Sequence, residues 1–145
     1  MSLAEDVREE TLALCGGATI LSKVDVSVLL QRVTETFVDP HLAHGAFWER
    51  LKDASGIHDP GAWRFVSQLL SESPVTMIID DFCGTSAVGI SCGGLVTEVL
   101  SRGIGFVFYV VDSELNYLIC VNDHDVLIGA GAAKAWILGL RDHSD

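Results

Sequence analysis

The segment Asn122-Asp123-His124-Asp125 is the densest group of side chains that could do chemistry in this sequence. An imidazole between carboxylates could act as a general base or bind a metal ion through nitrogen and oxygen ligands. Adjacent side chains in a tight turn point in different directions, so a metal would need further ligands from elsewhere, such as Asp80 or Asp81. Asn and Asp are also ordinary turn residues, because their side chains bond to the backbone. We therefore favour a structural turn and predict neither a metal nor a cofactor.

The thiol of Cys83 and the imidazole of His124 form a second combination, as a nucleophile and its base. A reactive thiolate needs an electropositive, partly exposed setting, whereas Cys83 follows two aspartates that disfavour the charged thiolate. The cysteines form no CxxC pair, so their spacing indicates neither a zinc site nor a disulfide framework. They stand at Cys15, Cys83, Cys92 and Cys120. We expect free thiols and predict no catalytic residues.

Asp80 and Asp81 follow an apolar run that is typical of a buried strand. Paired carboxylates could do acid–base work or hold a divalent ion, and strand ends are common places for such groups. Adjacent residues of a strand face opposite sides, so the two could share a site only where the strand has ended. We favour a solvated strand end.

The charge balance excludes some partners. The chain has 145 residues with 20 acidic and 9 basic side chains, a formal charge of −11. Residues 1–50, 51–100 and 101–145 are each net acidic, and no Lys/Arg cluster could release counterions from nucleic acid or from an anionic membrane. We therefore expect neither as a partner. A basic protein would be steered toward such a surface.

The length of the chain and its N-terminal sequence limit the class of protein. A chain of this length is typical of one domain, and with 49% hydrophobic residues it can bury a core without disulfides or metal. The acidic N-terminus lacks the features of a signal peptide, and the longest apolar run, residues 104–111, is too short to span a membrane. These features predict a single cytoplasmic domain over residues 1–145.

The first half of the chain predicts helices. Leu3, Val7 and Leu14 share a face after a capping box at Ser2, and a second helix follows Asp25 as its N-cap. We expect a short third helix with Phe47, Trp48 and Leu51, and a fourth that opens at Asp59-Pro60. The helical half then ends before Pro74.

The second half predicts a sheet. The expected strands are Val75–Ile79, Ala87–Ile90, Gly105–Asp112, Asn116–Val121 and Asp125–Gly129. Short connections between the last three favour antiparallel pairing. Helices are expected over Gly94–Arg102 and Ala132–Leu140, and Gly129-Ala-Gly131 reads as a close strand-to-helix turn. The order of elements predicts an α+β fold: a helical N-terminal half packed on a small, largely antiparallel sheet with a C-terminal helix.

The order of short motifs resembles a family. Phe47-Trp-Glu-Arg-Leu-Lys52 precedes Ala62-Trp-Arg-Phe65, the aromatic run Phe106–Asp112 and finally the segment Asn122–Gly129. This order resembles a family of small uncharacterised bacterial proteins with a central tryptophan–glutamate helix and a late Asn-His-His-Asp-like turn. Some members are encoded beside polymorphic-toxin genes, which implies an immunity role. Val121 and Asp123 stand where that pattern has Glu and a first His, so only Asn122, His124 and Asp125 match.

Three functions follow as hypotheses. The first is a small acidic binding module, an immunity protein that neutralises a bacterial toxin domain. The second is a metal-dependent or hydrolytic enzyme that uses the Asp123/His124/Asp125 turn, and the third is a regulatory or oligomeric domain without a ligand. The candidate partner-binding residues lie at strand ends and turns: Asp80, Asp81, Asp112, Glu114, Asp123, His124 and Asp125.

Overall fold

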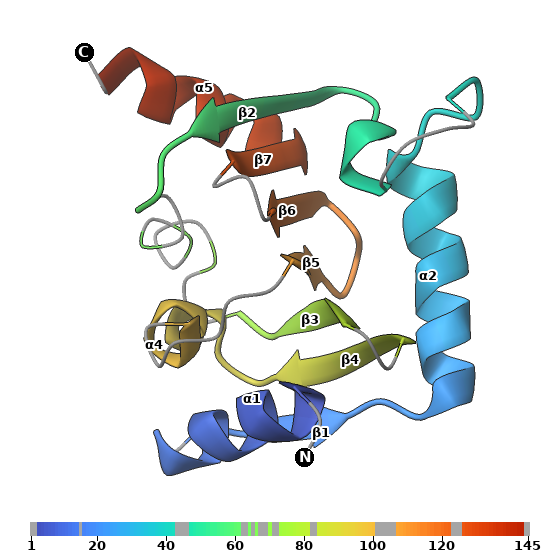
Figure 1. Cartoon of the computed structure of the whole chain (residues 1–145), viewed down its shortest axis with the longest axis vertical. Coiled ribbons are helices and arrows are strands. Elements are labelled where there is room, and N and C mark those ends of the chain that lie inside the picture. The colour runs from blue at the N-terminus through green and yellow to red at the C-terminus, as the bar shows by residue number, and fades with distance from the viewer. Residues whose placement is uncertain are drawn as a thin grey trace.

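The computed structural model describes residues 3–14, 16–42, 47–61, 64, 66, 70, 73–81, 84–100, 107–122 and 126–143. Seven strands of these residues form one sheet in the order β1-β4-β3-β5-β6-β7-β2, and every neighbouring pair is antiparallel (Figure 1). The strands are β1 Ala18–Ile20, β2 Ala54–His58, β3 Val75–Asp81, β4 Gly84–Ile90, β5 Val107–Asp112, β6 Tyr117–Val121 and β7 Val126–Gly131.

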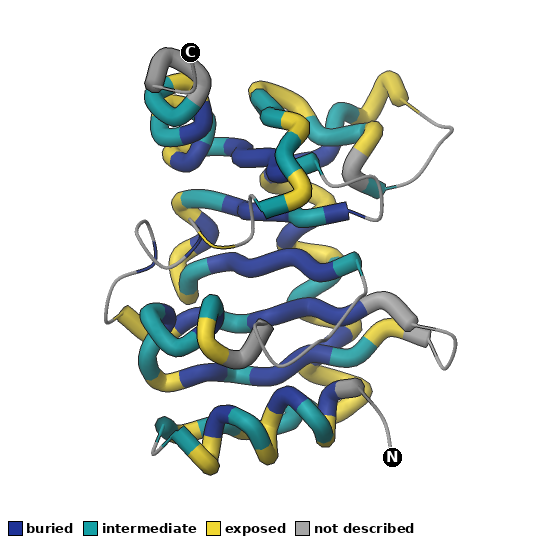
Figure 2. The backbone as a smooth tube through the Cα atoms, turned by 60° about the vertical axis from the view of Figure 1, so that its left-hand side comes forward, coloured by how far each residue is buried: buried dark blue, intermediate teal, exposed yellow. Residues whose placement is uncertain are grey.

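Helices cover both faces of this sheet. The helical elements are α1 Leu3–Ala13, α2 Lys23–Phe37, the 3-10 turns η1 Phe47–Glu49 and η3 Gly93–Leu95, α4 Val96–Leu100 and α5 Ala133–His143. The helix α2 runs across the strands on one side, while α1 and α5 lie at opposite ends of the sheet (Figure 1). Figure 2 shows the buried backbone in the middle strands and exposed residues on the helices and turns.

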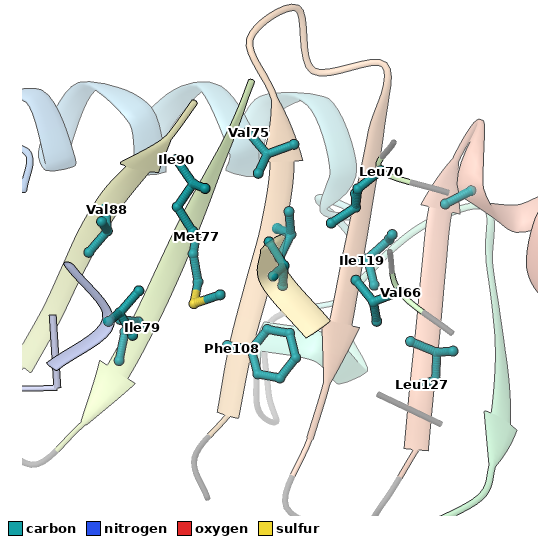
Figure 3. Packing of buried hydrophobic residues seen from close by; sticks show 14 of the residues in the cluster. Val66, Leu70, Val75, Met77, Ile79, Val88, Ile90, Phe108, Ile119 and Leu127 are labelled. Carbon is teal, nitrogen blue, oxygen red and sulfur yellow. The ribbon is translucent and has the colours of Figure 1, made fainter. Parts of the chain in front are cut away.

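Alternation along the strands builds two cores. On the face that α1, α4 and α5 cover, buried residues include Met77, Ile79 and Phe108 (Figure 3). On the face that α2 covers, Ile78 and Tyr109 are buried instead. Successive strand side chains point to opposite faces, so the apolar runs of β3 and β5 require a covering layer on each side.

The α+β prediction is confirmed, including the antiparallel sheet and a C-terminal helix whose Ile137 is fully buried and whose Trp136 packs partly buried against the same core. The first half is less helical than expected, because β1 and β2 were not predicted. Both are edge strands: β1 has only three residues and β2 consists largely of small residues, so their pairing with β4 and β7 decides their conformation.

Several local predictions were wrong. The N-cap of α2 is Ser22, whose hydroxyl accepts a hydrogen bond from the Asp25 amide at 3.1 Å, so Asp25 lies inside the helix. The expected third helix is only the 3-10 turn η1, and Leu51 instead bridges to Val38. The helix expected from Gly94 begins as the 3-10 turn η3 and becomes α-helical at Val96.

Other expectations fall partly or wholly outside the described residues. Val66 and Leu70 of the expected fourth helix are helical and buried, whereas Trp63 lies outside. Cys92 and Cys120 are free thiols, and Cys15 and Cys83 lie outside. No helix of the described part of the chain is long and apolar enough to cross a membrane.

The junction of β7 and α5 depends on two glycines. A Cβ at Gly129 would lie 2.6 Å from Ile137 Cγ1 and 2.7 Å from the Ala133 carbonyl oxygen, so the helix packs directly on the strand backbone. Gly131 has φ +63°, and a Cβ there would lie 2.6 Å from the Asn116 carbonyl oxygen. The expected close strand-to-helix turn is therefore confirmed.

Replacing Gly129 with alanine tests this close approach. We expect Gly129→Ala to lower the free energy of unfolding by about 1–3 kcal/mol, because the new methyl group overlaps α5 backbone. The matched control is Gly139→Ala in α5, where nothing lies within 4 Å of the added Cβ. That variant should gain about 0.5–1 kcal/mol from helix propensity. Urea unfolding of both variants measures this difference, and equal stabilities would contradict the close packing of α5 on Gly129.

Candidate functional site

Asp112, one of the candidate partner-binding residues, closes the turn between β5 and β6. Its Oδ1 accepts hydrogen bonds from the backbone amides of Asn116 at 2.7 Å and Tyr117 at 3.3 Å. Its Oδ2 accepts from Asn116 Nδ2 at 2.9 Å, which also lies 3.4 Å from Glu114 Oε2. A carboxylate that accepts several local hydrogen bonds stabilises the turn that contains it, and we call this arrangement the Asp112 clasp. Asp112 therefore has a structural role within the fold.

The same turn is tied to the start of α5. Leu115 adopts φ 56° and is buried, while its amide donates to the Asp112 carbonyl at 3.2 Å. The Asn116 carbonyl accepts from the Ala132 amide at 2.9 Å, next to the glycine junction described above. The Asp112 clasp thus positions the end of β7 and the first residues of α5.

Tyr117 is half-buried beside this clasp. Burial, together with the Asp112 carboxylate that repels a phenolate, raises the pKa of Tyr117 from 10.0 to about 12. The phenol therefore stays neutral at physiological pH.

Asn122 closes the second turn, between β6 and β7. It is 4% exposed, its backbone amide donates to the Val126 carbonyl at 3.2 Å, and its Oδ1 accepts from the Val126 amide at 3.1 Å. These bonds join the two ends of the turn, which supports the structural interpretation of Asn122. Asp123, His124 and Asp125 lie outside the described residues, so their roles remain predictions.

Asp80 and Asp81 belong to β3, which continues two residues past the predicted end at Ile79. In the ladder Asp80 pairs with Thr85 and Val107, and Asp81 pairs with Gly84. The two aspartates are therefore adjacent residues of a continuing strand, which does not favour a carboxylate dyad.

The structure separates the candidate acidic residues into two groups. At one end of the β3–β5 ladder Val75 pairs with Asp112, whereas Asp80 pairs with Val107 at the other. Five residues of strand separate the two ends, which is about 17 Å. The neighbouring strand β6 places Val121 opposite Phe108, so the Asn122 turn begins on the Asp80 side. Asp112 and Glu114 therefore lie at the opposite end from Asp80 and Asp81.

A cavity of about 200 Å³ lies between α2, η1 and the sheet, and we call it the α2 pocket. Its lining residues are Leu30, Val33, Thr34, Phe47, Ile78, Thr85 and Tyr109. The Phe47 ring meets Tyr109 edge-on, with centroids 5.2 Å apart and an interplanar angle of 81°. Arg50 lies over the Phe47 ring, with its Cζ 5.9 Å from the ring centroid. The sequence did not predict this pocket, because its walls come from five separate elements.

A second hollow, of about 340 Å³, lies where β1, β4 and β3 begin or end. Its walls include the hydroxyl side chains of Thr19, Thr76, Ser91 and Ser113. No aromatic side chain is among its described lining residues, in contrast to the α2 pocket. The α2 pocket is therefore the better candidate for holding an apolar group.

Within the described ranges, no three His, Cys, Asp or Glu side chains are grouped so that they could hold a metal ion. Comparison of the chain with protein-family models, with curated proteins and with solved structures finds no match. We therefore infer the function from the geometry above and from the sequence patterns.

The structural role of Asp112 is testable. We expect Asp112→Asn to lower the free energy of unfolding by about 1–3 kcal/mol, because an amide NH₂ must replace one acceptor oxygen of the clasp. Glu114→Gln is the control, since Glu114 is exposed and its 3.4 Å contact is long; its effect should stay below about 0.5 kcal/mol. Thermal or urea unfolding measures both. If neither variant changes the free energy of unfolding, the hydrogen bonds of Asp112 contribute nothing to stability.

Proposed function

We propose that the protein is a small acidic protein-binding module, an immunity protein that neutralises a bacterial toxin domain. Surface charge is the observation that carries the proposal. Among the described residues, exposed acidic side chains occur on α1, α2, α4 and the turns between elements: Glu5, Glu9, Asp25, Glu35, Glu49, Asp53, Glu98 and Glu114. With a net charge of −11, this surface attracts a basic protein.

The motif order between Phe47 and Gly131 also supports an immunity role, through its resemblance to proteins encoded beside toxin genes. In the resembled pattern the late turn is richer in His and Glu than it is here. Asn122 is retained, and its two bonds to Val126 hold the turn closed. A conformational role of this turn in shaping the binding surface needs no further ligand.

Electrostatic attraction explains how such a protein would act. A toxin that cleaves nucleic acid carries a basic substrate cleft, which an acidic surface can approach rapidly and then cover. The complementary charges raise the association rate, and short-range contacts between the two proteins then set the dissociation rate. An immunity protein acts inside the cell that makes the toxin, so the proposal includes a cytoplasmic location.

Co-expression with the product of the adjacent gene tests the proposal. We expect the chain to restore growth to cells that make that product, and the two proteins to co-purify. A chain that neither rescues growth nor binds any neighbouring gene product would overturn the immunity role.

Salt dependence tests the electrostatic part separately. We expect the dissociation constant of the purified pair to rise about tenfold or more between 50 and 500 mM NaCl, because exposed charges are screened at high salt. An affinity that does not change with salt would contradict charge-driven recognition, even if the two proteins bind.

A further inference from the structure

We propose that the α2 pocket receives one large apolar side chain that projects from a basic segment of the partner protein. The inference rests on the proposed function and deepens it, because it names the contact face and the chemistry of the partner. Protein interfaces commonly concentrate their binding energy in one aromatic or aliphatic anchor that fills a pocket.

The size and lining of the α2 pocket fit one such anchor. A cavity of about 150 Å³ already accommodates a benzene ring, so the α2 pocket, at about 200 Å³, holds a single ring or branched aliphatic side chain. Its inner wall is apolar: Val33 and Ile78 are 0% and 3% exposed, and Tyr109 is 5% exposed. Thr34 and Thr85 are exposed, which places the opening of the pocket beside them.

The walls of the pocket are held before any partner binds. Ile78 and Tyr109 are cross-strand partners in the β3–β5 ladder, and Phe47 packs edge-on against Tyr109. The Thr34 hydroxyl donates to the Leu30 carbonyl at 2.7 Å, which fixes its rotamer on α2. A preformed pocket loses little conformational freedom when it is filled, so more of the contact energy appears as affinity.

The charge of the chain favours a basic segment. Its net charge is −11, and exposed Glu49 lies two residues after the lining residue Phe47. Arg50 lies on the Phe47 ring, and exposed Arg32 precedes Val33 in α2, so basic side chains also occur near the pocket. The attraction of a basic segment therefore comes from the acidity of the whole chain.

Short peptides test the chemistry without the toxin. The probes are acetyl-Lys-Phe-Lys-amide, acetyl-Glu-Phe-Glu-amide and acetyl-Lys-Ala-Lys-amide, titrated into the isotope-labelled full chain and followed by NMR. We expect the first to shift the amide signals of Val33, Thr34, Thr85 and Tyr109 and to bind about fivefold tighter than the second. The alanine peptide should leave these signals unchanged, because it has no anchor.

Two threonine variants form a matched control. Thr34→Phe should fill the opening and abolish the shifts. Thr36→Phe should leave them intact, because Thr36 is exposed and donates to the Arg32 carbonyl at 2.7 Å in the same way, but lies on another side of α2. Should Thr34→Phe fail to fold, Thr85→Phe closes the opening from β4.

Each other outcome overturns the inference. Equal binding of the two phenylalanine peptides would mean that the pocket takes apolar groups without regard to charge, as a site for a small neutral molecule does. NMR shifts that persist in both Thr34→Phe and Thr85→Phe would place binding elsewhere. The absence of any shift in the unchanged protein would show that the pocket does not have this function. Growth rescue in co-expression is measured separately, so rescue without peptide binding refutes the pocket and retains the immunity role.

Discussion

The burial of β3 and β5 on both faces is the constraint on which the rest of this structure depends. Met77 and Ile79 point to one side of β3 and Ile78 points to the other, while Phe108 and Tyr109 divide in the same way on β5. Strands of this kind cannot have a solvated face, so the chain must supply helices to both sides. Among the described elements, α2 and η1 cover one side, and the space between them beside Tyr109 is the α2 pocket.

The acidic residues of the chain serve different purposes according to position. Asp112 accepts three hydrogen bonds within its own turn and so stabilises the fold. Exposed carboxylates such as Glu35 and Glu49 have no comparable role in a turn, and in the proposed function they attract a partner through charge. In the proposed mechanism, long-range attraction brings a basic protein to the surface, and the apolar pocket supplies the short-range contact that distinguishes one partner from another.

The sequence predicted those parts of the structure that have a strong periodic pattern. The runs around Val75, Phe108 and Leu118 were recognised as strands because they are apolar and bounded by turn residues. The edge strands β1 and β2 were missed, because a three-residue segment and the small-residue segment Ala54–His58 become strands only through pairing with β4 and β7. Ser22 could have been found, since it stands three residues before an acidic residue at the start of an apolar periodic run.

The site was less predictable than the fold. Asp112 was selected for its charge, although the asparagine four residues later is a sign of local bonding in a turn. The grouping of Asp80 with Asp112 was beyond sequence reasoning, because only the register of the β3–β5 ladder shows that they lie at opposite ends. The α2 pocket depends on contacts among elements that are distant in sequence, and no local pattern indicates it.

Hydrogen exchange of the chain, alone and bound to the proposed toxin partner, tests recognition through the α2 side most directly. We expect slower amide exchange on binding in residues 30–37, 47–51 and 84–87, with no change in α5. Protection confined to α1, α5 or β2, or no protection in a complex that forms, would contradict it.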